Sequence, residues 1–169
     1  YGPTNEEQVT DIFRRSIKSY KELPQLLYHI QWKFRDELRP RFGVMRGREF
    51  LMKDAYSFDL NLESSEASYN KFFVCYLKTF ERMGLKAIPM AADTGPIGGD
   101  MSHEFVIISN TGESDIYFDK NILDQGEKIS EINYDDDLST FVQNFKNYYS
   151  ASDEKFDQKK FDENVNKDL

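Results

Sequence analysis

Apolar and polar side chains alternate strictly through YHIQWKFR, residues 28–35, and this pattern leaves the segment little choice of backbone. Side chains recur on one face of a β-strand at every second residue, a period that no helix has. We therefore predict a strand with two distinct faces. The face expected to be buried holds Tyr28, Ile30, Trp32 and Phe34, and the polar face holds His29, Gln31, Lys33 and Arg35. On that polar face we expect His29 to be a hydrogen-bonded structural residue.

The segments around this strand predict an α+β fold, an antiparallel sheet flanked by helices. Residues 49–58 read as a second strand, and the loop before it contains Pro40, Gly43 and Gly47. Helices are predicted at 4–23, 63–84 and 135–149, and further short strands at 85–93, 103–109 and 115–119. Thr4 and Glu7 fit a capping box at the start of the first helix, and Gly84 ends the second.

Composition and charge exclude several classes of protein. The chain has 169 residues, of which 39% are hydrophobic, so we expect one sizeable core. No apolar run approaches the roughly 20 residues of a membrane helix, and we expect a cytoplasmic protein. The single Cys75 cannot form an internal disulfide, which favours a reducing compartment, and its apolar neighbours on a predicted helix suggest a core position.

Charge is distributed unevenly along the chain. Residues 1–112 carry 15 acidic and 15 basic side chains, whereas residues 113–169 carry 15 acidic and 7 basic ones. The acidic third is therefore a poor candidate for binding nucleic acid. We predict a boundary near residue 112 between two segments of different character.

A basic segment between Lys33 and Lys53 points to an anionic ligand, because it holds seven basic and only three acidic side chains. In a hairpin, Arg35 and Glu37 would share a face with side chains of the second strand. Those second-strand residues are Arg46, Arg48 and Phe50. Such a surface offers guanidinium groups for phosphates, a carboxylate for an amino group and a ring for stacking. A solvated basic loop with Phe50 in the core would give the same pattern, and spacing alone does not separate the two interpretations.

Other motifs favour neither a metal site nor a phosphate-binding loop. The two histidines, His29 and His103, and Cys75 are too far apart for a metal-ligand spacing, so we predict no metal site. The glycines at 95, 98 and 99 are not followed by Gly-Lys-Ser/Thr, which excludes a P-loop.

Three motifs resemble those of one enzyme family. FRDE, the Arg46-x-x-x-Phe50 spacing and LMKDAYSFD resemble motif 2 of class II aminoacyl-tRNA synthetases, specifically of bacterial-type prolyl-tRNA synthetases. GPTNEE resembles the proline-recognising Thr-x-Glu loop of that family, and DTGPIGGDMSHEF, residues 93–105, resembles its mobile proline-binding loop. The motifs occur in the family's order and cover most of residues 1–119.

The resemblance implies a role for each matching residue. Arg35 and Arg46 would be catalytic, holding the α-phosphate with the proline carboxylate and the γ-phosphate respectively. Glu37 would accept from the adenine amino group, and Phe50 would stack on the base. The proline-binding set would be Thr4, Glu6, Arg35, Phe58 and His103, and the mobile loop would include Asp93, Gly95, Gly98 and Gly99. Thr4 could equally be the helix cap, or serve in both roles.

The resemblance also implies substrates and a larger enzyme. ATP with Mg²⁺, L-proline and tRNA(Pro) would be the substrates of a homodimeric parent enzyme. We expect residues 1–112 to be part of the catalytic core and residues 113–169 to be a short acidic insertion without activity against mischarged alanyl-tRNA. No motif 3, motif 1 or anticodon-binding domain is recognised, so the segment by itself would be inactive. A non-catalytic paralogue, an amino-acid-sensing module and another class II specificity stay open as alternatives.

Overall fold

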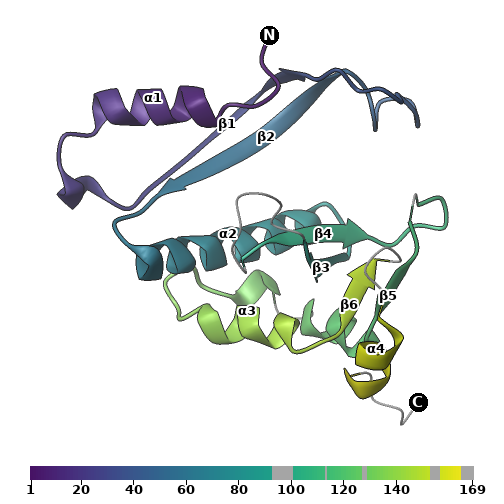
Figure 1. Ribbon diagram of the computed structural model, residues 1–169. Coiled ribbons are helices and arrows are strands. Elements are labelled where there is room, and N and C mark those ends of the chain that lie inside the picture. Colours follow the sequence, from purple (N-terminus) through teal and green to yellow (C-terminus); the bar gives the residue numbers. More distant parts are fainter. Residues whose placement is uncertain (93–100, 113, 127–128, 153–156, 165–169) are drawn as a thin grey trace. The chain divides into compact units, whose positions relative to one another are not determined.

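The computed structural model describes residues 1–92, 101–112, 114–126, 129–152 and 157–164 (Figure 1). These residues form two compact units, Tyr1–Ser68 and Tyr69–Leu169, which are described separately below. None of the helices in the described part of the chain is long and apolar enough to span a membrane. The acidic residues from 113 onward lie in the same compact unit as 69–112, and the functional boundary expected near residue 112 stays a prediction.

The first unit is built on a long antiparallel hairpin. Strand β1 (Gln25–Phe34) pairs with β2 (Glu49–Phe58) along its whole length, with Gln25 opposite Phe58 and Phe34 opposite Glu49. Both strands lie where the alternation predicted them. This register places Lys33 opposite Phe50, so the basic residues that follow β1 face those that precede β2.

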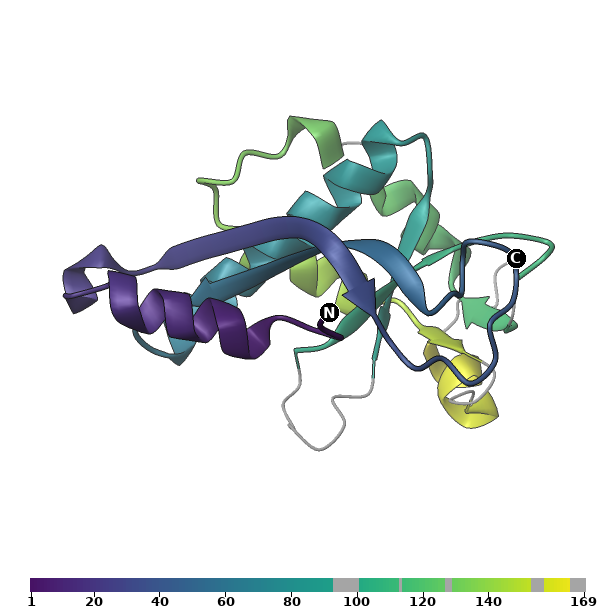
Figure 2. The same ribbon diagram turned by 90° about the horizontal axis from the view of Figure 1, so that it is seen from above.

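Helix α1 (Glu6–Ser16) lies along the hairpin in both views (Figures 1 and 2). Near the end of β2 the Phe13 and Phe58 rings are stacked, with centroids 3.9 Å apart. The helix ends seven residues earlier than predicted, and a 3₁₀ turn, η1 (Tyr20–Glu22), follows it. A capping box forms there: the Ser19 side chain accepts from Lys21 N–H, and Glu22 accepts from Ser19 N–H at 2.8 Å. The capping box predicted at Thr4 and Glu7 is wrong, because Asn5 is the N-cap of α1 and makes no side-chain cap bond.

The burial of the hairpin is the reverse of the prediction. Tyr28 is 72% exposed and Trp32 is 54% exposed, whereas Lys33 on the polar face is only 1% exposed. Polar side chains of the first unit supply partners for that face, so it can be covered at little cost. The apolar face lies open within the described residues. The exposed residues there are Leu26, Tyr28, Ile30, Trp32 and Leu51.

The second unit packs strands and helices around one aromatic core. Helix α2 (Leu62–Arg82) begins in the first unit and supplies Phe73 and Leu77 to this core. Strands β3 (Ala87–Ala91) and β4 (His103–Ile107) form one antiparallel pair, and β5 (Ile116–Phe118) and β6 (Ser150–Ser152) form another. The remaining elements are η3 (Lys120–Gly126), η4 (Ile129–Glu131), α3 (Ser139–Lys146) and α4 (Gln158–Asn164).

These elements confirm the predicted strands and most of the second helix. The described strands form three two-stranded antiparallel pairs rather than one continuous sheet. Cys75 is exposed, not in the core as expected, because the buried stripe of α2 runs through Phe73, Val74 and Leu77.

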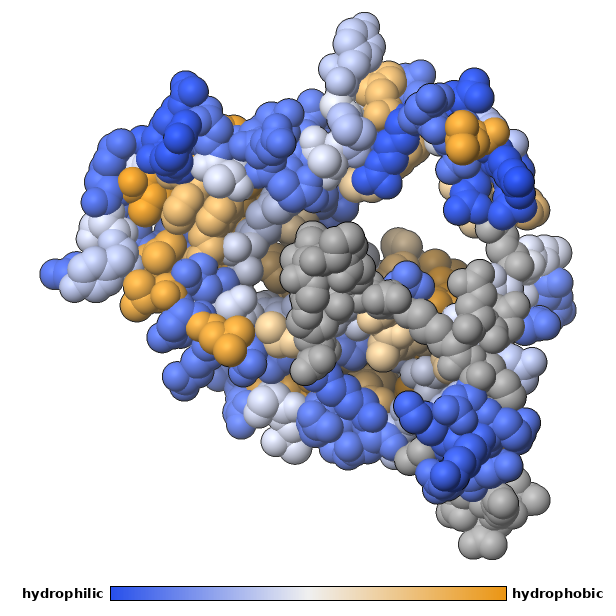
Figure 3. Space-filling view, in the orientation of Figure 1, coloured by the Kyte–Doolittle hydropathy of each residue, from blue (hydrophilic) through white to orange (hydrophobic). Residues whose placement is uncertain are grey.

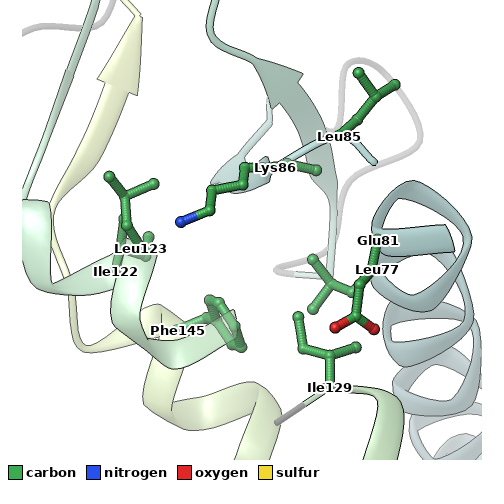
Figure 4. Close-up of a pocket in the computed structure, with 9 residues that line it drawn as sticks. Leu77, Glu81, Leu85, Lys86, Ile122, Leu123, Ile129 and Phe145 are labelled. Carbon is green, nitrogen blue, oxygen red and sulfur yellow. The ribbon is translucent and has the colours of Figure 1, made fainter. Parts of the chain in front are cut away.

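A pocket of about 230 Å³ opens in the second unit between α2, η3, η4 and α3 (Figure 4). Its walls are mainly apolar, with Leu77, Ile129 and Phe145 among them, and Lys86 and Glu81 contribute the charged groups. None of the site residues predicted from the sequence lines it.

Candidate functional site

The residues predicted to bind ATP form two pairs at the end of the hairpin where the loop joins β1 to β2. The Arg35 guanidinium carbon lies 5.4 Å from the centroid of the Phe50 ring, which puts the charge and the ring on one surface. Glu37 and Arg46 lie across the loop from each other, with 3.5 Å between Oε2 and Nε. The loop that carries these groups is largely hydrophilic, with isolated hydrophobic residues (Figure 3).

Backbone contacts hold this loop in shape beyond the regular strands. Arg35 N–H donates to the carbonyl of Arg48 at 2.9 Å, and Arg48 Nε donates to the carbonyl of Glu37 at 2.9 Å. The Glu37 carboxylate also accepts from the backbone N–H of Arg39 at 2.9 Å. Farther along the loop, Arg41 and Arg46 form an isolated antiparallel bridge. The arginine side chains therefore project from a backbone that is fixed on both sides of the loop.

The N-terminal segment runs beside the end of β1 and brings the candidate proline residues to Arg35. Phe34 N–H donates to the Gly2 carbonyl at 3.0 Å, and Arg35 Nε donates to the Pro3 carbonyl at 2.9 Å. The next side chain, Thr4, donates its hydroxyl proton to the carboxylate of Glu6. This hydrogen bond, followed by one from the backbone of Glu6 itself, lowers the pKa of Glu6. An ionised carboxylate therefore lies close to Arg35.

A polar network lies under this segment on the covered face of the hairpin. Asp54 accepts from His29 Nδ1 at 2.7 Å, from Lys33 Nζ at 3.2 Å and from the hydroxyl of Tyr56. Burial by itself raises the pKa of Asp54, but the hydrogen bonds and the nearby positive charges outweigh burial and lower the pKa to about 2. Burial and the contact with Asp54 raise the pKa of Tyr56 to about 12.

Asn5 joins the network to the N-terminal segment. Its side chain lies 2.6 Å from Nε2 of His29. In the amide orientation that satisfies both of its polar atoms, its oxygen accepts from His29 and from Lys33, and its nitrogen donates to the Thr4 carbonyl at 3.2 Å. His29 thus bridges Asn5 and Asp54, in agreement with the structural role predicted for it.

The structure does not bring every predicted residue to this place. Phe58 lies opposite Gln25, at the other end of the hairpin from Arg35. His103 belongs to the second unit, where Tyr69 lies 2.7 Å from its Nδ1 and where burial, followed by the charge of Lys146, lowers its pKa. Its role in proline binding stays a prediction. The predicted mobile-loop residues Asp93, Gly95, Gly98 and Gly99 lie outside the described residues.

Sequence reasoning missed Asn5, Lys33, Asp54 and Tyr56 as parts of the site. The pairing register contains a signal that could have found three of them. Directly opposite residues of a hairpin share a face, so Lys33 opposite Phe50 places Lys33 on the same side as Asp54 and Tyr56. An acid, a base and a phenol on one covered face are expected to hydrogen-bond. Asn5 carries no comparable signal, because it lies outside the strands.

Together these groups can bind an anion and a cation side by side. Arginine binds phosphate or carboxylate through a planar pair of donors. Glu6 can accept from an ammonium group, and Phe50 offers a ring for stacking. Groups of three or more potential metal ligands do not occur within the described residues.

Comparison with known proteins gives this arrangement a family. A model of the tRNA synthetase class II core domain (G, H, P, S and T) matches residues 1–161. Proline--tRNA ligase of Pelagibacter ubique (strain HTCC1062) is 62% identical over 168 residues, which are 99% of this chain and 38% of the relative. The corresponding ligase of Parvibaculum lavamentivorans is 60% identical with the same coverage. That of Bradyrhizobium diazoefficiens is 58% identical over 98% of this chain and 38% of its own length. The chain thus spans well under half of these relatives, and by the match along nearly all of its length it belongs to the class II tRNA synthetase core domain family.

Proposed function

We propose that this chain carries the ATP- and proline-binding part of a proline--tRNA ligase. The reaction would join the carboxylate of L-proline to the α-phosphate of ATP and then transfer the prolyl group to tRNA(Pro). One observation supports this proposal above the others. The first unit by itself gathers Thr4, Glu6, Arg35 and Phe50 at one end of the hairpin, which supports a shared site for an amino acid and a nucleotide.

Each side chain then has one chemical task. Glu6 and Thr4 receive the secondary ammonium of proline, since a cation held in a pocket needs a carboxylate partner. Arg35 contacts both the proline carboxylate and the α-phosphate and brings them into line. Phe50 stacks on adenine, and Glu37 accepts from the adenine amino group. Arg46 holds the γ-phosphate end of a bent nucleotide.

The chemistry needs no nucleophilic side chain. A proline carboxylate oxygen forms the bond to the α-phosphorus, the bond to the bridging oxygen of pyrophosphate breaks, and pyrophosphate leaves. The protein contributes position and neutralisation of charge, and Arg35 is placed for both. Mg²⁺ would neutralise phosphate charge. It would depend on the nucleotide and water for most of its ligands, which is common for this ion at phosphates.

The ion pair between Glu37 and Arg46 suits a site that exchanges partners. Its side chains are 30% and 43% exposed, and exposed pairs contribute only about 0–1 kcal/mol to stability. ATP can therefore separate them at small cost, giving Arg46 a phosphate and Glu37 an amino group. The weak ion pair therefore supports a role for both groups in binding the nucleotide.

The test is titration with a non-hydrolysable prolyl-adenylate analogue, using threonyl and alanyl analogues for comparison. It is run on this chain and on a chain extended at both ends to the length of the relatives. We expect the prolyl analogue to bind best. Arg35→Ala should weaken binding by at least about tenfold through loss of a charge-assisted contact. Arg39→Ala removes a charge from the same loop without removing a predicted contact, and it should bind like the unmodified chain.

Failure of the extended chain to bind the prolyl analogue would exclude the proposed function. Binding without ATP–pyrophosphate exchange in the extended chain would instead favour an amino-acid-sensing paralogue. Equal binding of the three analogues would contradict proline specificity while leaving a class II nucleotide site in place.

A further inference from the structure

The candidate proline-binding segment has a buried residue between its two exposed ones. Thr4 and Glu6 are exposed, whereas Asn5 between them is only 6% exposed. Asn5 makes no cap bond to helix α1. Its amide is directed to His29 on the covered face of the hairpin. The position of Asn5 therefore determines where Thr4 and Glu6 are presented.

Asp54 is the side chain that the other polar groups of this face contact. It lies on β2, and it accepts from His29 and Lys33 on β1 and from Tyr56 on its own strand. Lys33 is nearly inaccessible to water, so its charge has to be compensated inside the protein. Asp54 compensates it and still has a contact to His29, and His29 carries that contact on to Asn5.

We propose that Asp54 and His29 are positioning residues for proline, which hold Asn5 and through it fix the Thr4 hydroxyl and the Glu6 carboxylate at the ammonium-binding position. The inference rests on the proposed function of the same site. It assigns to this network a role in amino-acid affinity and none in nucleotide affinity, because the network contacts Asn5, the neighbour of Thr4 and Glu6, whereas Arg46 pairs with Glu37 in the loop.

Replacing Asp54 would raise the Michaelis constant for proline even if the role of Asp54 were purely structural. The test therefore changes the contacts between Asp54 and Asn5. His29→Leu removes one of the two side chains that bridge Asn5 and Asp54, and it leaves the other, Lys33, and the Tyr56 contact in place. His29→Gln keeps N–H donors for Asp54 and Asn5, because its amide nitrogen carries two hydrogens. Tyr28→Leu, on the neighbouring residue and the opposite face, is the matched control.

The measurement is ATP–pyrophosphate exchange in the chain extended to the length of the relatives. We expect His29→Leu to raise KM for proline about tenfold, the effect of losing a hydrogen bond to a charged group, and to leave KM for ATP unchanged. His29→Gln should recover most of the proline affinity, and Tyr28→Leu should leave both constants unchanged. Hydrogen–deuterium exchange in residues 2–6 should be faster in His29→Leu than in Tyr28→Leu.

A second variant removes both buried charges and keeps the proposal falsifiable if a single change unfolds the protein. Lys33→Met combined with Asp54→Asn leaves neither charge of the pair without its partner. We expect the melting temperature of this double variant to equal that of the unmodified chain, and its KM for proline to be higher. Normal proline KM in this double variant, or equal changes in the constants for proline and ATP, would overturn the positioning role. If no amino acid stimulates ATP–pyrophosphate exchange in the unmodified extended chain, the proposed function fails and this inference fails with it.

Discussion

Asp54 is a carboxylate whose burial would destabilise the fold without partners and stabilises it with them. Isolated, a covered carboxylate would lose hydration and favour its neutral form. Three donors reverse this balance, and its pKa falls to about 2. Lys33 gains equally, since a cation with almost no exposure needs a counter-charge. The two strands are therefore joined by their side chains as well as by their backbones.

This balance predicts the acid sensitivity of the first unit. A carboxylate whose pKa is lower in the folded state stabilises the fold fully above its unfolded pKa, near 4, and this contribution is lost as the pH falls through about 2. We expect urea midpoints to fall between pH 4 and pH 2. In Asp54→Asn the urea midpoint should fall less between pH 4 and pH 2, and the protein should be less stable at pH 7 than the unmodified chain. Asp11→Asn, on the surface of α1, serves as the control. An unchanged pH dependence in Asp54→Asn would contradict the assignment.

At this scale the sequence predicted which residues of the hairpin loop lie together better than it predicted the network beneath them. Arg35, Glu37, Arg46 and Phe50 belong to a motif with fixed spacing, and the structure brings them together in pairs. The contact between Asn5 and His29 joins residues 24 positions apart. Such a contact depends on how the N-terminal segment docks on the hairpin, which no local pattern encodes.

Among the elements, the hairpin has an apolar face that the described residues of the first unit leave uncovered. Scattered apolar residues are normal on a protein surface, but on this face every second residue of β1 from Leu26 to Trp32 is apolar and exposed. Continuous patches of this kind mark interfaces or promote aggregation. Trp32, the only tryptophan of the chain, lies at one end of this face, opposite Leu51, and can report on its environment.

We expect this chain to bind a hydrophobic dye and to show Trp32 fluorescence that acrylamide quenches efficiently. Ile30→Thr combined with Leu51→Thr should reduce dye binding without loss of far-ultraviolet circular dichroism. Threonine suits a β-strand as well as the isoleucine and leucine that it replaces. Leu38→Thr, at an isolated exposed position in the loop, should have little effect. Protection of Trp32 from acrylamide would show that the face is covered in solution.

The period of β1 could be predicted, but which of its faces is covered could not. Alternation fixes only that two faces differ. Which face is covered depends on the segments that dock there, and in the first unit α1 and Asn5 meet the polar face. The first helix was predicted too long for a related reason. The Ser/Thr-x-x-Glu signature occurs twice, at Thr4–Glu7 and at Ser19–Glu22, and the structure uses the second to begin a new turn.

Over the whole molecule, charge is separated along the chain. The net charge of −8 resides in residues 113–169, while the loop after β1 is locally basic. Polyanions approach such a molecule against a net repulsion, and any attraction to the loop is screened at physiological ionic strength. The second unit, which contains the acidic segment, is thus a poor surface for nucleic acid.

We therefore expect this chain alone to bind tRNA weakly. Gel retardation should be absent at about 10 μM protein in about 150 mM salt, and weak at low salt through the basic loop. The residual binding should disappear in Arg39→Ala combined with Arg41→Ala. Tight binding that is insensitive to salt would show that recognition by shape or bases outweighs the charge distribution.

The register of β1 with β2 also determines where this chain can change in length. A single residue inserted within either strand would turn every following side chain to the opposite face and separate Asp54 from His29 and Lys33. Residues 42–45 lie beyond the last backbone pairing, that of Arg41 with Arg46, and can lengthen or shorten at a modest cost in loop entropy. Insertions and deletions should therefore be tolerated at the tip of the hairpin and rejected along its strands.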